Sequence, residues 1–244
     1  RLGLPGTRAP FIGELMRRFR CDAIPEPGER TLLDAEVSHH LLLVTRVPRG
    51  HQVELFDGDG RSAVATLVDV EAARAVVEVD RLQQHQVDAP LRLLAAVTKG
   101  PRFETALRMA VELGATEVVP VLAARSVARG DRKARWLRVI EGASQQSGRA
   151  VCPVLRPLTL FADVVAEPSP GLRWVCLPGA AAVPGTLGAA SVLVGPEGGW
   201  TDAEADHARL AGWQAAGLGP HVLRAETAVA AALARVRCEG AARS

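Results

Sequence analysis

The sequence predicts an α/β protein of two domains, a small β-rich domain followed by a larger domain built on a parallel sheet. Three observations predict this fold class. Short β-rich runs and turns fill the chain from Met16 to Arg81, and residues 83–90 form a polar linker that ends in proline. Beyond Pro90, apolar runs of strand length alternate with helical patterns, as in a parallel sheet covered by helices. We therefore expect domains over residues 16–85 and 86–244.

The first domain is predicted to be a small barrel of short strands. Its strands are expected at residues 41–44, 53–56, 63–68 and 75–79, where apolar and β-branched residues concentrate. Asp57-Gly58-Asp59-Gly60 lies between two of these runs and predicts a hairpin turn. Residues 1–15, with two prolines and three glycines, are assigned no structural role and are interpreted as an extension or a disordered start.

The second domain is predicted to alternate strands and helices. Strands are expected at residues 91–97, 118–122, 172–177 and 191–194, and helices at residues 101–113, 131–149, from Thr201 onward, and 224–237. Pro101 begins the first helix and Gly114 follows its end, which is the usual asymmetry of helix termini. Thr201 and Glu204 have the spacing of a capping box.

Composition bounds the function. Apolar residues make up 48% of the 244, aromatic residues only 4%, and no apolar run is long enough to span a membrane. The four cysteines lack metal spacing, which favours reduced thiols in the cytoplasm and no metal site. Net charge is only +2, but residues 99–149 carry ten basic against five acidic residues. This segment is either a phosphate-facing surface or a solvated helix face.

Several common site motifs are absent from the sequence. It contains no P-loop, no Gly-x-Gly-x-x-Gly after the first strand of the second domain, no zinc spacing and no Gly-x-Ser-x-Gly elbow. Two other loops are informative, Gly195-Pro196-Glu197-Gly198-Gly199 and Leu218-Gly219-Pro220-His221. Each follows an apolar run and precedes a helix, and glycine lets backbone groups approach a ligand closely. At adjacent strand ends they would form one ligand crevice. The alternative is a pair of tight strand-to-helix turns.

Together these motifs resemble the 16S rRNA uracil-N3 methyltransferase family of the knotted SPOUT class. That family carries a Gly-Pro-Glu-Gly-Gly loop and a Leu-Gly-x-x-(Ile/Val)-Leu-Arg-x-Glu-Thr-Ala loop, matched here at residues 195–199 and 218–228. Further matches are Lys99, Glu112-Leu113-Gly114, Arg125-Ser126, and Glu141 followed by Gln145-Gln146-Ser147-Gly148-Arg149 before Pro153. The resemblance covers residues 16–240, and one departure is Gly142, where the family often has alanine.

The resemblance implies a PUA-like RNA-binding barrel over residues 16–85 and a trefoil-knotted methyltransferase domain over residues 86–244. It also implies a homodimer formed through the knotted domain, with S-adenosylmethionine as cofactor. The implied reaction is methylation of N3 of a specific uridine in 16S ribosomal RNA of the small subunit. A knot departs from the rule that chains do not thread loops, so it rests on the resemblance alone.

Site residues follow from the matched motifs. The expected cofactor-binding residues are Leu177, Pro178, Gly179, Val194, Gly195, Pro196, Glu197, Gly198, Gly199, Leu218, Gly219, Pro220, Val222, Leu223 and Thr227. The expected catalytic residues are Arg149, Arg224 and Glu197. The expected RNA-binding residues are Arg17, Arg18, Arg20, Lys99, Arg125, Gln146 and Arg149. Surface ion pairs are the alternative for the arginines, and Glu226 is expected either to act as a base or to hold a backbone amide.

Two other functions are consistent with parts of the pattern. One is a SPOUT ribose 2′-O-methyltransferase, which usually has an asparagine and a serine-containing loop in this region. Glu226-Thr227-Ala228 and Gln146-Ser147-Gly148-Arg149 favour the uracil enzyme instead. The other is an RNA-binding scaffold without catalysis, against which the two intact cofactor loops argue.

Overall fold

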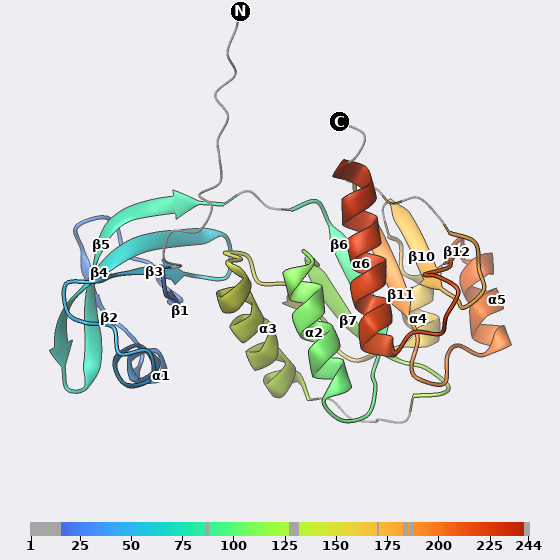
Figure 1. Cartoon of the computed structure of the whole chain (residues 1–244), viewed down its shortest axis with the longest axis horizontal. Helices are drawn as coiled ribbons and strands as arrows, with labels where there is room; N and C mark the ends of the chain where they lie inside the picture. Colours follow the sequence, from blue (N-terminus) through green and yellow to red (C-terminus); the bar gives the residue numbers. More distant parts are fainter. Residues whose placement is uncertain are drawn as a thin grey trace, which may run out of the picture. The chain divides into compact units, whose positions relative to one another are not determined.

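The computed structural model describes residues 16–85, 88–126, 132–169, 171–182, 185 and 188–241. The chain divides into two compact units, Arg1–His85 and Gln86–Ser244 (Figure 1). The extension expected at residues 1–15 lies outside the described residues. Within the described ranges, no helix is both long enough and apolar enough to cross a membrane.

The N-terminal unit is built on a mixed five-stranded sheet in the order β1-β3-β4-β5-β2. Its strands are β1 (Arg18–Arg20), β2 (Arg30–Leu32), β3 (Gln52–Phe56), β4 (Arg61–Glu71) and β5 (Arg74–Gln84). The strands predicted at residues 53–56, 63–68 and 75–79 are confirmed. The Asp57 carboxylate closes the predicted hairpin by accepting hydrogen bonds from the backbone N–H groups of Asp59, Gly60 and Arg61. β1 and β2 were not predicted because three residues are too few to show alternation.

The strand predicted at residues 41–44 is wrong. This run forms η1 (His40–Val44), a π-helical turn that continues α1 (Ala35–His39). Leu41 is fully buried in the core of the unit, whereas Leu43 and Val44 are 63% and 61% exposed. A short apolar run does not distinguish a helix from a strand by its period, and here the helical turn buries Leu41 and partly buries Leu42.

The hydrogen-bonded strands of the N-terminal sheet form an open series. β1 and β2 lie at its two edges, and among the described residues these edges do not pair with each other. The long β4–β5 ladder has two register shifts, between Val64 and Ala65 and between Leu67 and Asp69, and such irregularities bend a sheet. A closed PUA-like barrel therefore stays a prediction.

The turn between β4 and β5 carries backbone strain. Ala72 and Ala73 have φ angles of 45° and 63°, in the left-handed region that costs an alanine about 1 kcal/mol. Both are the central residues of a two-residue hairpin, where Asn-Gly is the preferred pair. Replacing Ala72→Asn and Ala73→Gly together is expected to raise the free energy of unfolding of this unit by about 1–2 kcal/mol.

Urea unfolding followed by circular dichroism measures this change. The matched control is Glu71→Gly, which places a glycine in the adjacent strand, where its backbone freedom should destabilise the unit. An unchanged unfolding midpoint for the double variant would show that the two alanines are not strained.

The C-terminal unit is built on a parallel sheet in the order β12-β10-β11-β6-β7-β8, with β9 also paired to β7. Its strands are β6 (Leu91–Ala96), β7 (Glu117–Leu122), β8 (Val154–Leu155), β9 (Thr159–Leu160), β10 (Leu172–Cys176), β11 (Ala190–Val194) and β12 (Gln214–Ala216). Its helices are α2 (Arg102–Glu112), α3 (Lys133–Ser147), α4 (Phe161–Ala166), α5 (Asp202–Leu210) and α6 (Ala225–Ala241). Every strand pair is parallel, so the predicted parallel α/β sheet is confirmed.

Helices cover both faces of this sheet (Figure 1). Leu91, Leu93 and Ala95 of β6 point into a core shared with α2, α3 and α6. Leu94 and Ala96 point to the other face, into a core shared with α4 and α5. Side chains alternate along a strand, so a continuous apolar run fills both cores.

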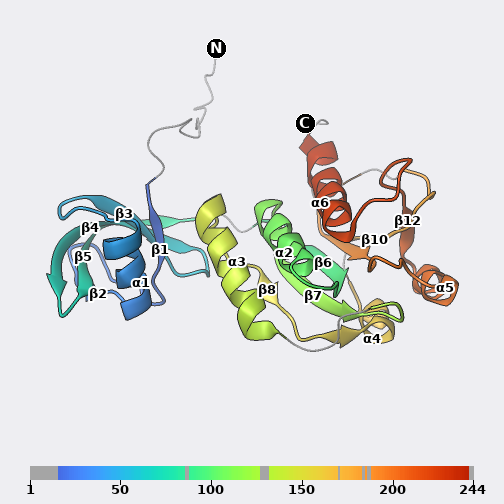
Figure 2. The ribbon, with the colours of Figure 1, turned by 60° about the horizontal axis from the view of Figure 1, so that its bottom comes forward.

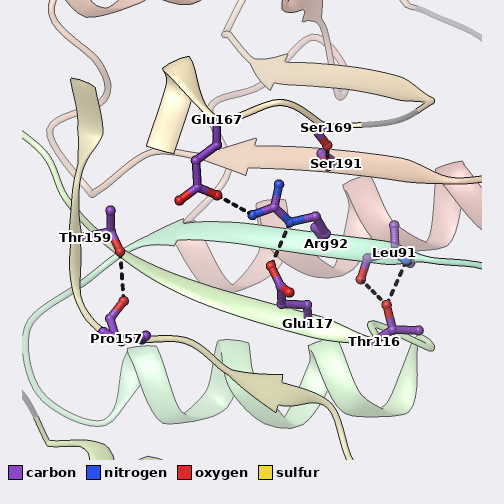
Figure 3. Close-up of polar contacts among 9 residues, drawn as sticks. All are labelled: Leu91, Arg92, Thr116, Glu117, Pro157, Thr159, Glu167, Ser169 and Ser191. Atoms are coloured by element: carbon purple, nitrogen blue, oxygen red, sulfur yellow. Dashed lines mark hydrogen bonds and ion pairs between the residues drawn. The ribbon is translucent and has the colours of Figure 1, made fainter. Parts of the chain in front are cut away.

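Polar side chains join the amino-terminal ends of neighbouring strands (Figure 3). Arg92 donates from Nε to Oε1 of Glu117 at 2.7 Å and from Nη2 to Oε2 of Glu167 at 2.8 Å. Burial lowers the pKa of Arg92, but the bonds to Glu167 and Glu117 outweigh this, and the pKa is raised overall. The hydroxyls of Ser169 and Ser191 hydrogen-bond nearby. These contacts fix one end of the sheet and leave its carboxyl end to the loops.

All four predicted strands and all four predicted helices of this unit are present, with ends shifted by a few residues. Asp131, the expected start of α3, lies outside the described residues. The capping box is confirmed: the Glu204 N–H donates to Thr201 Oγ1 at 3.1 Å, and the Thr201 N–H donates to Glu204 Oε2 at 2.8 Å. The short elements α4, β8, β9 and β12 were not predicted.

Candidate active site

A pocket with an empty volume of about 630 Å³ opens at the carboxyl ends of β10 and β11. Three chain segments line it, residues 176–178, 194–200 and 218–228. The carboxyl edge of a parallel sheet is where open α/β folds bind ligands. The two Gly/Pro loops therefore meet in one pocket, as expected.

The first loop is shaped by contacts to its backbone. The Gly199 N–H donates to the Pro196 carbonyl at 2.8 Å, with Gly199 at a φ of 68°. Arg125 donates from Nη1 to the carbonyls of Gly198 and Trp200, at 2.8 and 3.2 Å. The Trp200 indole packs on the Phe161 ring at 5.0 Å. These contacts hold the loop in one conformation, in which it forms one wall of the pocket.

Gly195 allows the Trp200 indole to pack directly against the backbone of the loop. A Cβ atom built on Gly195 would lie 3.1 Å from Cε2 and 3.2 Å from Nε1 of Trp200. Any side chain at this position would therefore displace the indole or enter the pocket. A glycine is required here because the indole approaches the backbone closely.

The second loop follows a tight crossing of two chain segments. Gly217 donates its N–H to the Ala181 carbonyl at 2.9 Å, and a Cβ built on Gly217 would lie 1.8 Å from the Ala180 carbonyl oxygen. Arg235 of α6 donates to the Gly217 carbonyl at 3.0 Å. From Leu218 to Leu223, no backbone N–H donates to an acceptor in the described part of the chain. These groups remain available to a ligand.

Buried polar atoms without partners adjoin this region. In the described ranges, Trp200 Nε1 and Glu226 Oε2 are buried and form no hydrogen bond. An unpaired buried polar atom costs free energy unless water or a ligand satisfies it. Trp200 lines the pocket and Glu226 lies beside the lining residue Ala225. With the free backbone N–H groups, this donor set fits an adenosine-containing ligand.

The structure brings most of the expected cofactor residues together. The lining includes Leu177, Pro178, Val194, Gly195, Pro196, Glu197, Gly199, Leu218, Gly219, Val222 and Leu223. The remaining expected residues, Gly179, Gly198, Pro220 and Thr227, are not part of the lining. Gly198 instead faces Arg125, whose Cβ and Cδ would lie 3.3 Å from an added Cβ. Gly179, Pro220 and Thr227 are exposed beside the lined segments.

Five lining residues were not predicted: Cys176, Trp200, His221, Ala225 and Ala228. All adjoin the predicted loops, so extending each loop by a few residues would have included them. Burial raises the pKa of the Cys176 thiol to about 12, which keeps it protonated at neutral pH. Cys176 is thus an apolar wall residue rather than a nucleophile. No group of three or more metal-ligating side chains occurs among the described residues.

Two of the three expected catalytic residues lie at the pocket. Glu197 lines it, and Arg102 Nη1 lies 3.4 Å from Glu197 Oε1. Arg224 follows the lining residue Leu223 and is exposed, and its side chain forms no hydrogen bond or ion pair with the residues that the structure describes. Arg102 was not predicted, although it follows the Lys99-Gly100 pair at the end of β6.

Arg149 lies away from the pocket lining. Its Nη1 donates to the carbonyls of Val111 and Ala115 at 2.9 and 2.7 Å, and its Nη2 lies 3.4 Å from Asp88 Oδ2. The side chain is 13% exposed, and burial lowers its pKa below the ordinary value. The guanidinium binds carbonyls at and just beyond the end of α2, and Arg149 is not part of the pocket lining. This geometry supports a structural role for Arg149, and its expected catalytic or RNA-binding role stays a prediction.

Replacing Arg149→Ala is expected to destabilise the C-terminal unit by about 2 kcal/mol, because two carbonyls lose a charged donor. The melting temperature should fall by roughly 4–8 °C. The affinity for S-adenosylmethionine, measured by calorimetry on the folded variant, should not change. Arg156→Ala, which removes an exposed arginine, is the control and should leave both quantities unchanged. A stable Arg149 variant with lost ligand affinity would contradict the structural assignment.

The expected RNA-binding residues lie on several elements of the two units. Lys99 and Gln146 are exposed, Lys99 after β6 and Gln146 on α3. Arg125 is also exposed, but its Nη1 binds the first pocket loop. Arg17, in the N-terminal unit, is exposed as well.

The expected basic cluster of Arg17, Arg18 and Arg20 is not a free cationic surface. Arg18 is buried, with Nε 3.0 Å from Glu54 Oε2 and its guanidinium carbon 4.9 Å from the centre of the Phe56 ring. Arg20 donates from Nε to Asp22 Oδ1 at 2.9 Å. Because β1 pairs with β3, Arg18 is drawn onto the sheet beside Glu54. Sequence proximity did not reveal these acidic partners.

Known proteins are similar to this chain in sequence and in fold. Residues 85–237 match the family model described as an RNA methyltransferase domain. The ribosomal RNA small subunit methyltransferase E of Synechocystis is 36% identical, over 84% of this chain and 72% of that protein. Its namesake from Mycobacterium bovis is 33% identical, over 89% and 90%.

A solved structure extends the likeness to three dimensions. The ribosomal RNA small subunit methyltransferase E of Neisseria gonorrhoeae, bound to S-adenosylmethionine, superposes with a TM-score of 0.86 at 32% identity. The match covers 92% of this chain and 98% of that one. The chain therefore belongs to the RNA methyltransferase family, and within it to the ribosomal RNA small subunit methyltransferases E.

Proposed function

We propose that this protein transfers a methyl group from S-adenosylmethionine to N3 of a specific uridine in 16S ribosomal RNA of the small subunit. The observation that carries the proposal is the pocket at the carboxyl ends of β10 and β11. It is walled by both loops that match the uracil-N3 family. A relative with this fold binds S-adenosylmethionine.

The pocket residues supply binding and orientation. The free backbone N–H groups between Leu218 and Leu223 hold the adenine and ribose, with Leu177 and Pro178 as apolar walls. Glycines 195 and 199 let the first loop approach the ligand closely. S-adenosylmethionine supplies an electrophilic methyl group on its sulfonium sulfur. Rigid loops fix the position of that ligand relative to the uracil. Such positioning contributes to the rate enhancement.

Uracil N3 carries a hydrogen and becomes a good nucleophile when that proton leaves. Arg224, exposed beside Leu223, is the residue we assign to the uracil carbonyls, because a planar guanidinium binds such acceptors and stabilises developing negative charge. Glu197 lines the pocket next to Arg102 and is the carboxylate we assign to proton transfer or to uracil orientation. Lys99 is assigned to the RNA backbone.

Further features belong to the same proposal. The N-terminal unit acts as a PUA-like RNA-binding barrel, in which exposed Arg17 is the remaining member of the expected basic cluster. The C-terminal unit is trefoil-knotted and forms a homodimer through that unit. The tight crossing of Gly217 and Ala180 supports the knot. An rRNA substrate is consistent with a cytoplasmic location.

Two measurements on the purified protein test the proposal. Calorimetric titration with S-adenosylmethionine should give one binding transition, and incubation with labelled cofactor and small subunits should label 16S RNA. Digestion to nucleosides should then yield 3-methyluridine. A 2′-O-methylated nucleoside would identify the ribose methyltransferase instead, and the absence of both heat and label would identify a scaffold.

A further inference from the structure

A second hollow lies on the C-terminal unit, between α2 and α3. These helices lie side by side in both views (Figure 2). The hollow has an empty volume of about 810 Å³. It is lined by Arg108, Glu112, Arg135, Arg138, Val139, Gly142, Ala143 and Gln146, which we call the α2–α3 groove. None of these residues lines the cofactor pocket.

The groove is rich in guanidinium groups. Arg108 and Arg138 are exposed, and within the described ranges neither side chain forms a hydrogen bond or an ion pair. Arg135 is held by Glu104, with Nε 2.6 Å from Oε1 and Nη2 3.0 Å from Oε2. Glu104 is buried, while the Arg135 side chain stays 60% exposed. The ion pair therefore fixes the orientation of the Arg135 guanidinium and leaves it accessible to a ligand. Glu112 is the one carboxylate in the lining.

Small residues line the floor of the groove. Gly142 has no side chain, and a Cβ built on it would meet nothing within 4 Å. Its neighbour Ala143 is small, and Gln146 adds an amide donor at the same edge. Guanidinium and amide donors around a shallow floor match the oxygens of a phosphodiester backbone, which proteins bind without reading sequence.

The helix that lines one side of the groove, α2, begins beside the cofactor pocket. Arg102, the first residue of α2, contacts Glu197 in the pocket lining. Arg108 lies six residues further along the same helix, which corresponds to about 9 Å of helix axis. We propose that the α2–α3 groove binds the sugar-phosphate backbone of the nucleotides that flank the target uridine. This inference rests on the proposed function and adds a binding surface to it.

A charge change on the groove floor tests the proposal. Gly142→Glu and Gly142→Gln place side chains of equal length at an exposed helix position with open space, so both variants should fold. The glutamate variant is expected to bind 16S RNA roughly tenfold more weakly than the glutamine variant at low salt, since only it repels phosphate. Equal RNA affinity for the two variants would overturn the proposal.

Removing the free arginines gives a second test. For Arg108→Ala with Arg138→Ala, the slope of log affinity against log salt should fall by about 1.4, the value for two lost contacts to single-stranded phosphates. The control pair, Arg156→Ala with Arg209→Ala, removes the same charge from exposed positions outside the groove and should leave the slope unchanged. Equal slopes for the two pairs would refute the groove.

The affinity for S-adenosylmethionine should be unchanged in all of these variants. Failure of the groove is distinguishable from failure of the proposed function. If wild-type protein methylates the RNA while the groove variants bind it normally, only the groove is refuted. If wild-type protein transfers no methyl group, the function itself fails.

Discussion

Replacing Gly217→Ala is expected to abolish S-adenosylmethionine binding and to destabilise the C-terminal unit by about 3 kcal/mol. The added Cβ would lie 1.8 Å from the Ala180 carbonyl oxygen and 2.7 Å from its carbon, both of which are backbone atoms. No side-chain rotation relieves such an overlap, so the two segments must separate. The separated segments continue into Pro178 and Leu218, which both line the pocket.

Thermal unfolding and calorimetry measure the two effects of Gly217→Ala. The melting temperature should fall by roughly 6–12 °C. The control is Gly142→Ala, the same substitution in an open helical position, which should raise stability by about 0.5–1 kcal/mol and leave the ligand affinity unchanged. A Gly217 variant with normal stability and affinity would show that the crossing of residues 217 and 180 does not build the pocket.

The second large effect is expected at Gly195. Replacing Gly195→Val should lower the affinity for S-adenosylmethionine by roughly 10- to 100-fold, because overpacking costs about 1–3 kcal/mol. The Trp200 indole lies against this glycine and is backed by Phe161, so it cannot move far, and the new methyl groups enter the pocket. The fold should survive because the pocket side is open.

A graded series strengthens the Gly195 test. Gly195→Ala adds one carbon at 3.1 Å from the indole and should show a smaller loss of affinity than Gly195→Val. Circular dichroism confirms that each variant is folded. Equal affinities for wild type, Gly195→Ala and Gly195→Val would mean that the ligand does not occupy the space in front of Trp200.

The sequence predicted those features of the fold and of the site that depend on residues close together in the chain. Apolar runs defined β6, β7, β10 and β11, because a buried parallel strand needs apolar side chains on both faces. Thr201 and Glu204 identified the start of α5, since a capping box is a local arrangement. The Gly/Pro loops identified the pocket for a similar reason: they follow strands that all end at one edge of the sheet.

The arginines show what the sequence could not decide. Arg149 and Arg18 look like available cations in the sequence, yet one binds the end of α2 and the other lies beside Glu54. These partners are separated from them by 38 and 36 positions, and only the fold brings them together. The same holds for Arg102 and Glu197 and for Arg135 and Glu104. Whether an arginine is free or engaged is therefore a tertiary property.

The central claim, uridine N3 methylation in 16S RNA, is tested most directly by mass mapping of small-subunit ribosomal RNA. The RNA is taken from cells that have this protein, from cells that lack it, and from cells that carry only the Gly195→Val variant. One fragment should lose the mass of a single methyl group in the second sample, and a smaller share of that fragment should carry the group in the third sample than in the first. Nucleoside analysis should assign the group to N3 of uridine. Identical maps for cells with and without the protein would contradict the account.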